Sequence, residues 1–477
     1  MALKPVLAAA LVFDIACAGS TGPRETASNI QFLAGNHQSD TIQATLSQAL
    51  VTRVAYAATG QPVVHQVVQF ISVADSAGTS AEAFSTQLTS NYPQEFTVDT
   101  TDASGKCVVT ITLGPQAGRA RLVVKVPALG FVDTAVFTVT AGRPAGIRSG
   151  PADTAVYAGH TATLHSAVAD RFGNPRTDPV TYAVASGPAT LSGSTVTVTA
   201  IGRVMITASG LGFQGTTHLS GVPTGMIAGS TDSGIAVFNL DGSGYKKILK
   251  APAGTVVWAP SGTSIVFDQT QGNIQTAAPL LQSVTLGGTV SVLDNSTSTT
   301  GLYDTWPTYA ANGSWIYYVK ELQGSGSSLW RVHPDASNDA VVSMQNPPGV
   351  QYPSASPDGS QVAYIVPGPG TLNILDVSTG VSTNIGGIAG YAVSWSPTGN
   401  LIVYQTGSGT LMTVHPDGTG QTPLGTAAYS QLFSWSPDGK WVIAVNQSTS
   451  KVELLSVTSN LILPLGYTGR IASPSWH

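Results

Sequence analysis

The chain has 477 residues, more than the roughly 250–300 at which a single hydrophobic core stops growing, so we expect several domains. Only 9% of the residues are charged and 52 are glycine, a composition that favours β-sheets and turns over exposed helices. The formal net charge is −5 and no basic block occurs, so the sequence argues against a nucleic-acid partner.

The first 18 residues are typical of an export signal, because Lys4 precedes an apolar run at residues 6–13 that is too short to span a bilayer. The segment Ile15-Ala16-Cys17 resembles a bacterial lipobox, although Asp14 stands where that family has an aliphatic residue. The resemblance implies that Cys17 is lipidated and anchors an outer-membrane or cell-surface protein, with residues 19–28 as a tether. The alternatives are ordinary cleavage at Ala16-Cys17-Ala18, which would give a periplasmic or secreted protein, and an uncleaved start.

Residues 29–142 alternate apolar and polar positions in short runs separated by Gly, Pro and Asp turn signals. About seven such strands in this length predict an immunoglobulin-like β-sandwich. Residues 143–223 partly repeat the pattern, since the Gly60-Gln61-Pro62 turn returns as Gly173-Asn174-Pro175. These turns, with Thr101-Asp102-Ala103-Ser104-Gly105 and the strand start at Ala117-Gly118, resemble bacterial Ig-like modules of the invasin and intimin type. The resemblance implies two spacer domains that contribute no catalytic residues.

A five-residue pattern recurs through residues 224–477, most clearly as Trp435-Ser436-Pro437-Asp438-Gly439. Its copies begin at positions 258, 309, 355, 395, 435 and 476, so the steps are 51, 46, 40, 40 and 41 residues. A period of roughly 40–50 residues with several strands per repeat is typical of β-propeller blades. We expect the tryptophan to pack between blades and Pro and Asp-Gly to form a turn. Each turn offers one carboxylate, too few for a calcium site.

The two ends of this region complement each other. Residues 471–476 supply one strand, and residues 226–249 supply three strands that no motif strand precedes. Pairing them would complete one blade and remove an open sheet edge. The sequence therefore predicts an all-β chain, with two immunoglobulin-like β-sandwiches followed by a six-bladed β-propeller closed by pairing of its N- and C-terminal strands.

The repeated motif makes residues 224–477 similar to the TolB-like, WD-repeat-like propeller family. In that family the six-bladed ring is the protein-binding part of the Tol-Pal envelope system, and it also forms the lid domain of prolyl oligopeptidase-type peptidases. The resemblance implies a protein-binding ring. It does not extend to TolB's own α/β N-terminal domain, whose place the Ig-like modules take, or to a hydrolase domain.

The sequence has no G-x-S-x-G, H-E-x-x-H, C-x-x-C or P-loop motif, so we predict no catalytic residues, no metal site and no cofactor. The strand that enters each motif should lie innermost in its blade, so residues three to six positions before the motif should ring one mouth of the axial channel. These are Tyr303, Asp304, Trp306, Gln351, Tyr352, Tyr391, Tyr429, Gln431 and Arg470. Aromatic and hydrogen-bonding groups at a rim suit a peptide or glycan, whereas the alternative is that the aromatics merely plug the channel.

We expect a monomeric, non-enzymatic binding protein in which Ig-like spacers present the propeller to a protein or polysaccharide partner. One alternative is a polysaccharide lyase or hydrolase, which would need acid, His or Arg side chains to converge within about 5–9 Å in the channel. Asp304 and Arg470 are the only obvious candidates for that role. The other alternative is a structural adhesin.

Overall fold

The computed structural model describes residues 29–73, 81–84, 96–269, 281–294, 302–322, 326–342, 344, 349–385, 390–467 and 469–477. These residues form β-strands and one short 3-10 helix, Pro127–Leu129, and no helix among them is long and apolar enough to cross a membrane. The chain divides into two compact units, Met1–Ala145 with Ala169–Arg176, and Gly146–Val168 with Thr177–His477. The expected signal and tether, with Cys17, lie outside the described residues.

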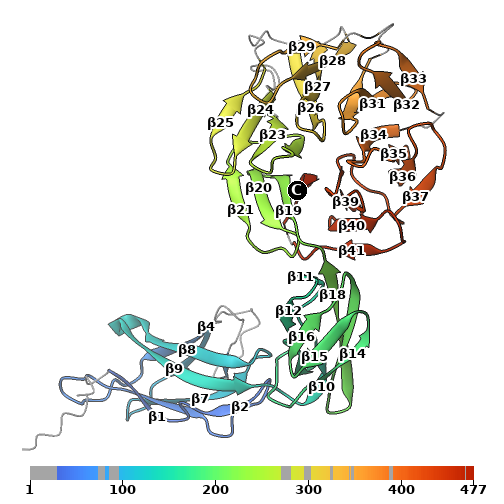
Figure 1. The fold of residues 1–477 in the computed structure, drawn as a ribbon. Helices are drawn as coiled ribbons and strands as arrows, with labels where there is room; N and C mark the ends of the chain where they lie inside the picture. Colours follow the sequence, from blue (N-terminus) through green and yellow to red (C-terminus); the bar gives the residue numbers. More distant parts are fainter. Residues whose placement is uncertain are drawn as a thin grey trace, which may run out of the picture. The chain divides into compact units, whose positions relative to one another are not determined.

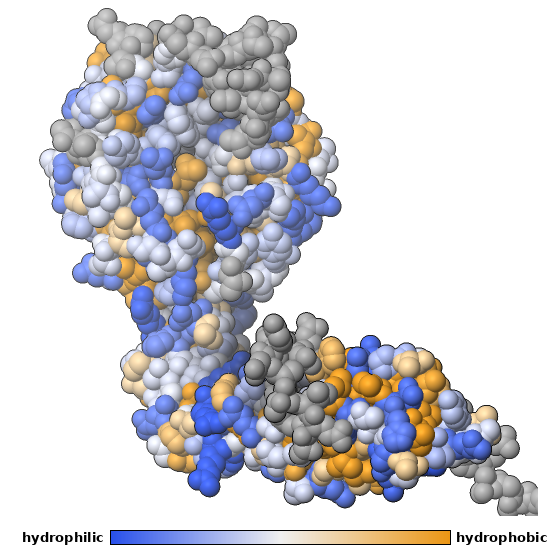
Figure 2. Space-filling model, turned by 180° about the vertical axis from the view of Figure 1, so that it is seen from behind, coloured by the Kyte–Doolittle hydropathy of each residue, from blue (hydrophilic) through white to orange (hydrophobic). Residues whose placement is uncertain are grey.

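The first unit is a two-sheet sandwich. One sheet has the order β1 (Ile30–Ala34), β3 (Leu50–Val54), β7 (Lys106–Leu113), β5 (Ala81–Phe84), and the other has β2 (Ser39–Thr41), β9 (Phe131–Thr140), β8 (Gly118–Val126), β4 (Val67–Val73), β6 (Phe96–Thr100). Alternate residues of each strand enter the core, where Phe70 and Phe137 are buried. Cys107 also lies in this core, and burial raises the pKa of its thiol to about 12. Figure 2 shows hydrophobic surface over this unit, and Val132 is one of its exposed apolar side chains.

The second unit begins with a smaller sandwich. Its sheets have the orders β11 (Thr154–Tyr157), β18 (Phe213–Val222), β17 (Gly202–Gly210), β14 (Thr181–Ser186), and β12 (Thr161–Thr163), β16 (Thr195–Val198), β15 (Ala189–Ser192). Strands β10 (Pro144–Arg148) and β13 (Ala167–Asp170) lie where the chain passes between the units. Ala155 and Val222 of this sandwich share a buried cluster with Leu240 and Trp441 from the sheets that follow. The Arg203 side chain also donates to the carbonyl of Ile462 at 2.8 Å.

The rest of the second unit is a β-propeller. Among the described residues, six four-stranded antiparallel sheets are arranged around a common centre (Figure 1). Five have consecutive strands: β22 (Val256–Trp258), β23 (Ser264–Asp268), β24 (Leu281–Thr285), β25 (Val290–Val292); β26 (Leu302–Tyr309), β27 (Ile316–Leu322), β28 (Gly326–Val332), β29 (Ala340–Val341); β30 (Gln351–Ala355), β31 (Gln361–Val366), β32 (Thr371–Asp376), β33 (Ser382–Asn384); β34 (Gly390–Trp395), β35 (Ile402–Thr406), β36 (Leu411–Val414), β37 (Thr422–Leu424); β38 (Ser434–Trp435), β39 (Trp441–Val445), β40 (Val452–Ser456), β41 (Ile462–Pro464).

The remaining sheet joins two distant parts of the chain. Its order is β21 (Lys246–Leu249), β20 (Gly234–Asn239), β19 (Met226–Thr231), β42 (Ala472–Trp476). Ile227 lies opposite Trp476, and the backbone N–H groups of Met226 and His477 each donate to the other's carbonyl at 2.9 Å. The structure therefore contains a sheet that combines strands from the two ends of residues 224–477, as the sequence predicts.

The motif residues hold neighbouring sheets together. Trp435 packs in a cluster with Val403 and Leu411, which belong to the preceding sheet. In the turn, the Asp438 carboxylate accepts the Ser436 hydroxyl at 2.6 Å and the Lys440 N–H at 3.1 Å. No group of three or more acidic, His or Cys side chains among the described residues is arranged to hold a metal ion. Asp438 and Asp358, the aspartates of the motif, accept hydrogen bonds within their own turns.

Candidate functional site

Two cavities lie along the propeller axis, and all six innermost strands contribute to both. The smaller, of about 110 Å³, is lined near the strand starts by Thr255, Trp306, Tyr352, Val393, Gln431 and Ser473, and the larger, of about 440 Å³, is lined by motif residues such as Trp258, Tyr309, Trp395, Trp435 and Trp476. Six residues line both cavities, one from each innermost strand: Val257, Thr308, Ser354, Ser394, Ser434 and Ser475. The cavities are thus two mouths of one channel.

The waist between the mouths is polar and fastens the sheets to one another. The hydroxyl of Ser354 accepts the backbone N–H of Trp395 at 2.8 Å, and that of Ser475 accepts the N–H of Trp258 at 2.9 Å. Each bond joins the innermost strands of two sheets. Among the described residues, the lining of the smaller cavity carries no Asp, Glu, Lys, Arg or His. The smaller mouth therefore offers hydroxyls and aromatic rings to a ligand in place of formal charge.

Two aromatic residues at the smaller mouth have an unusual backbone conformation. Trp306 has φ of 52° and Tyr352 has φ of 49°, both in the left-handed region. Their rings face each other with centroids 4.4 Å apart and planes 31° apart. A left-handed bulky residue costs on the order of 1–3 kcal/mol, and such strain tends to gather at functional sites. Trp306 and Tyr352, here called the aromatic pair, are thus the strongest candidates for binding residues.

A local sequence feature explains this conformation. Each residue of the pair precedes a proline, Pro307 or Pro353, which cannot donate to the strand ladder. The ladder is interrupted at both places, between Thr305 and Thr308 in β26 and between Gln351 and Ser354 in β30. Such β-bulges redirect side chains near functional sites. The same step to proline occurs as Ser473-Pro474 before Trp476, where Ser473 has φ of 52°, so the aromatic ring at this position is what distinguishes the two blades of the pair.

Two polar contacts hold the pair in place. The Tyr352 hydroxyl donates to Oε1 of Gln431 at 2.8 Å, and the backbone N–H of Trp306 donates to Oδ2 of Asp268 at 3.0 Å. Burial, and then the negative charges of Glu321 and Asp268, raise the pKa of the Tyr352 phenol, so Tyr352 remains a neutral donor at ordinary pH. Trp306, Tyr352 and Gln431 are therefore brought together as expected. Asp268 was not among the residues expected from the sequence.

The other expected rim residues divide into exposed and buried ones. Tyr391, on β34, is 53% exposed, and Gln351 is half-buried at the start of β30. Tyr429 is fully buried, and its hydroxyl donates to the Glu453 carboxylate at 3.1 Å. The backbone of Tyr303 lies on β26, but its side chain is outside the described ones. Tyr429 thus packs inside the blade, and the expectation that it faces the rim is corrected.

Asp304 and Arg470 do not converge. Arg470 is exposed and faces the equally exposed Asp232 at 3.8 Å, an arrangement that contributes little to stability. Asp304 is 2% exposed and lies beside Asp294 and Lys320 within the β26–β29 sheet. The expectation that Asp304 faces the rim is corrected, because a strand directs successive side chains to opposite faces and Asp304 lies on the inner one. The carboxylate and guanidinium required by the lyase or hydrolase alternative are not assembled by this pair.

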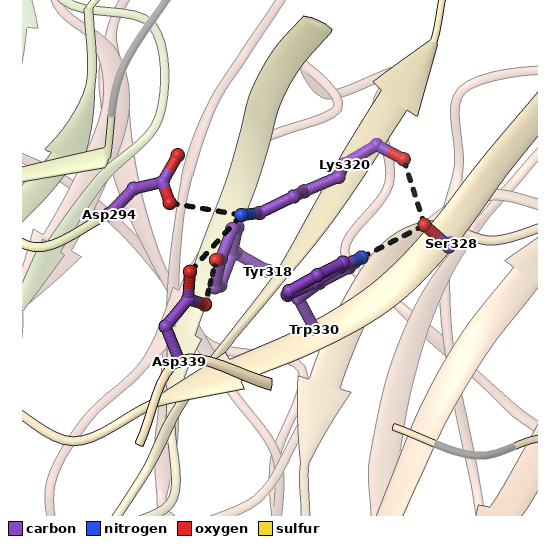
Figure 3. A network of polar contacts seen from close by, with 6 residues as sticks. All are labelled: Asp294, Tyr318, Lys320, Ser328, Trp330 and Asp339. Atoms are coloured by element: carbon purple, nitrogen blue, oxygen red, sulfur yellow. Dashed lines mark hydrogen bonds and ion pairs between the residues drawn. The ribbon is translucent and has the colours of Figure 1, made fainter. Parts of the chain in front are cut away.

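Next to Asp304, the buried charges of Lys320, Asp294 and Asp339 form a network, and Figure 3 shows these three side chains. The Lys320 ammonium donates to Asp294 at 2.9 Å and to Asp339 at 3.2 Å, and it lies 3.9 Å from the centre of the Trp330 ring. Burial, followed by the hydrogen bond and charge of Asp294, raises the pKa of Asp304 to about 9, so Asp304 is protonated at neutral pH. One cation thus faces two carboxylates and one neutral acid. This arrangement suits blade packing, since buried charges need partners.

Comparisons with known proteins give similarities of fold. No protein-family model matches the chain, and no curated protein matches it. Among solved structures, it is similar to TolB from Acinetobacter baumannii, with 16% identity, a TM-score of 0.43 and coverage of 64% of this chain and 83% of that one. It is also similar to a chain of the nidogen/laminin complex, with 9% identity, a TM-score of 0.44 and coverage of 53% and 98%.

Proposed function

We propose that this chain is an exported, non-enzymatic envelope or surface protein whose propeller binds a protein or polysaccharide partner at the mouth around the aromatic pair. Residues 29–142 and 143–223 serve as Ig-like spacers, and residues 224–477 form a closed six-bladed ring. Cys17 carries the lipid anchor in this proposal, and mass spectrometry of the mature N-terminus tests that part directly.

The observation that carries the proposal is the strained aromatic pair. Trp306 and Tyr352 adopt a left-handed backbone conformation that is unfavourable for bulky residues. Both line a cavity to which every innermost strand contributes. Aromatic rings with a nearby amide, here Gln431, are typical of binding hot spots. Ring packing alone would not require two left-handed residues, because the motif tryptophans pack between sheets in ordinary strand geometry.

Closure of the ring supports the same proposal. β42 pairs with β19, so the first and last strands of the propeller lie in one sheet. Closure completes the sixth sheet and holds the six innermost strands around the axis. A rigid rim reduces the ordering that binding would otherwise require, which favours affinity.

The direct test is site-specific photo-cross-linking in the full-length chain. A benzophenone amino acid replaces the exposed Tyr391 near the mouth or, as a matched control, Tyr245, which is 48% exposed and precedes the outermost strand β21. The full chain is used because the smaller sandwich shares a buried cluster with the propeller. We expect an adduct with one envelope protein or polysaccharide from position 391, absent from position 245 and lost in the Trp306→Ala, Tyr352→Ala variant. Equal adducts from both positions would contradict the proposal.

A further inference from the structure

Asp268, at the end of β23, connects two neighbouring sheets. Its carboxylate is 4% exposed. Oδ1 accepts the N–H of Thr255 at 2.7 Å, and Oδ2 accepts the N–H of Trp306 at 3.0 Å. Thr255 directly precedes β22 of the same sheet, whereas Trp306 lies on β26, the innermost strand of the next sheet. One buried carboxylate therefore holds the start of its own sheet and the left-handed residue of its neighbour.

The bulge explains why Trp306 needs this partner. Where β26 is interrupted, Trp306 has no opposite residue in the ladder with β27. A buried N–H group without an acceptor is costly, so a nearby side chain must supply one. The carboxylate is a strong acceptor because it is charged, and charge-assisted hydrogen bonds are roughly twice as strong as neutral ones.

The position of Asp268 recurs in the repeat, but its chemistry does not. Asp268 lies ten residues after Trp258, and the residues ten positions after the other motif starts at 309, 355, 395 and 435 are Val319, Ile365, Gln405 and Val445. Gln405 also reaches the next sheet, where its amide donates to the carbonyl of Tyr429. In the sheet closed by β42 the corresponding residue is Ser230, whose hydroxyl donates to the carbonyl of Ala253 before β22. A bond to the next sheet from this position therefore recurs in the repeat, but an acid occurs there only in the blade that precedes Trp306.

We infer that Asp268 is a positioning residue of the binding mouth, whose ionised carboxylate holds Trp306 in place, so that proton uptake by this group loosens the aromatic pair and weakens partner capture. The inference rests on the proposed function for its last step. Its first step, the proton-dependent position of Trp306, stands on the contacts of Asp268 alone.

The surroundings of Asp268 bring the titration of its carboxylate into a pH range in which the protein can be studied. Burial raises the pKa of Asp268 to about 6, against the lowering effect of the N–H groups of Trp306 and Thr255. Glu321 on β27 and Tyr352 on β30 both act electrostatically in this neighbourhood. On β26, Asp304 belongs to the Lys320 network and burial raises the pKa of Tyr309 to about 12. Strands β22 and β24 have no ionisable side chain.

The test uses fluorine NMR of the full-length chain labelled with 5-fluorotryptophan. The chain has 8 tryptophans, and the Trp306→Phe variant assigns the Trp306 resonance. In the wild type we expect that resonance to shift with a midpoint near pH 6. In Asp268→Asn the shift should disappear, whereas the matched variant Asp417→Asn, in an exposed turn, should retain it. A wild-type resonance that does not move between pH 4.5 and 7.5, or one that moves equally in Asp268→Asn, overturns the inference.

One further measurement separates this inference from the proposed function. If Asp268→Asn does not fold, the wild-type titration assigned with Trp306→Phe still tests whether Trp306 moves with pH. Cross-linking from position 391 at pH 7.5 and pH 5 then tests the last step, with a loss of about fivefold expected at the lower pH, as for a weakened charge-assisted hydrogen bond. A titrating Trp306 with no adduct at either pH rejects the proposed function and leaves the positioning role intact.

Discussion

At the mouth lined by the repeated motif, Trp258, Trp395, Trp435 and Trp476 are 5–7% exposed and follow regular strand geometry. At the opposite mouth, Trp306 and Tyr352 are left-handed, interrupt their strands and face each other. The same residue types thus occupy both ends of one channel, but only one end carries strain. The difference fits a motif mouth built for packing, and in our proposal the aromatic pair is the part that contacts a partner.

The largest change in stability is expected at the motif mouth. Replacing Trp435 with alanine removes a large buried ring between two sheets, and such changes typically lower the free energy of unfolding by about 3–5 kcal/mol. We expect Trp306→Ala to lower it by less than half as much, because Trp306 is only partly buried. Denaturant unfolding of both variants measures the difference. Equal losses would show that both mouths are packing.

The next effect concerns Asp268 and pH. Its pKa is raised from 3.8 to about 6, so between these values the folded chain holds a proton that the unfolded chain releases. The stability contribution of Asp268 is therefore complete below pH 3.8 and is lost as pH rises through 6, by roughly 3 kcal/mol in total. Denaturation of wild type and Asp268→Asn from pH 4 to pH 8 should show this slope in the wild type only. A slope retained in the variant would assign it elsewhere.

A smaller effect tests the strain itself. At φ of 49°, glycine is favoured over any residue with a Cβ atom, so Tyr352→Gly should be more stable than Tyr352→Ala by about 1 kcal/mol. This reverses the usual order within strands, where alanine is preferred over glycine. The same pair of substitutions at Tyr404, in the regular strand β35, provides the control. An alanine variant at least as stable as the glycine variant at position 352 would contradict the strained conformation.

The smallest effect is expected at Tyr391. This side chain is 53% exposed, so Tyr391→Ala should change the free energy of unfolding by no more than about 0.5 kcal/mol. Partner capture should nevertheless fall, because the ring lies beside the mouth in our proposal. Thermal unfolding and quantitative cross-linking from a second rim position, Gln351, measure the two quantities. Unchanged capture would remove Tyr391 from the binding surface.

The repeat made much of the architecture predictable. The motif spacing and the Asp-Gly turns predict several four-stranded sheets, and the unmatched strands near Met226 and Trp476 predict that these segments share a sheet. Such features are local and periodic, so they can be read without knowing how the chain folds. The aromatic pair could also be named from its distance to the motif.

The finer placement of the site could not be predicted in this way. Counting back from the motif assumes regular strands, but the bulges at Trp306 and Tyr352 change which side chains of β26 and β30 face the channel, and Asp304 lies inside its blade. Tyr429 is also buried, because it precedes β38 and forms only an isolated bridge, with Asn446. Asp268 was missed because it lies thirty-eight residues before Trp306 in the sequence. The two residues are joined only by a hydrogen bond between neighbouring sheets. The aromatic-proline steps were visible in the sequence, and they mark where the regular count fails.

The most direct measurement compares partner capture and unfolding in one variant, Trp306→Ala with Tyr352→Ala, against Trp435→Ala under the same conditions. The account predicts that the double variant loses capture of the cross-linked partner by tenfold or more while its free energy of unfolding falls by less than about 2 kcal/mol. The result that would contradict it is a double variant that captures the partner as well as wild type, or one that unfolds as readily as Trp435→Ala.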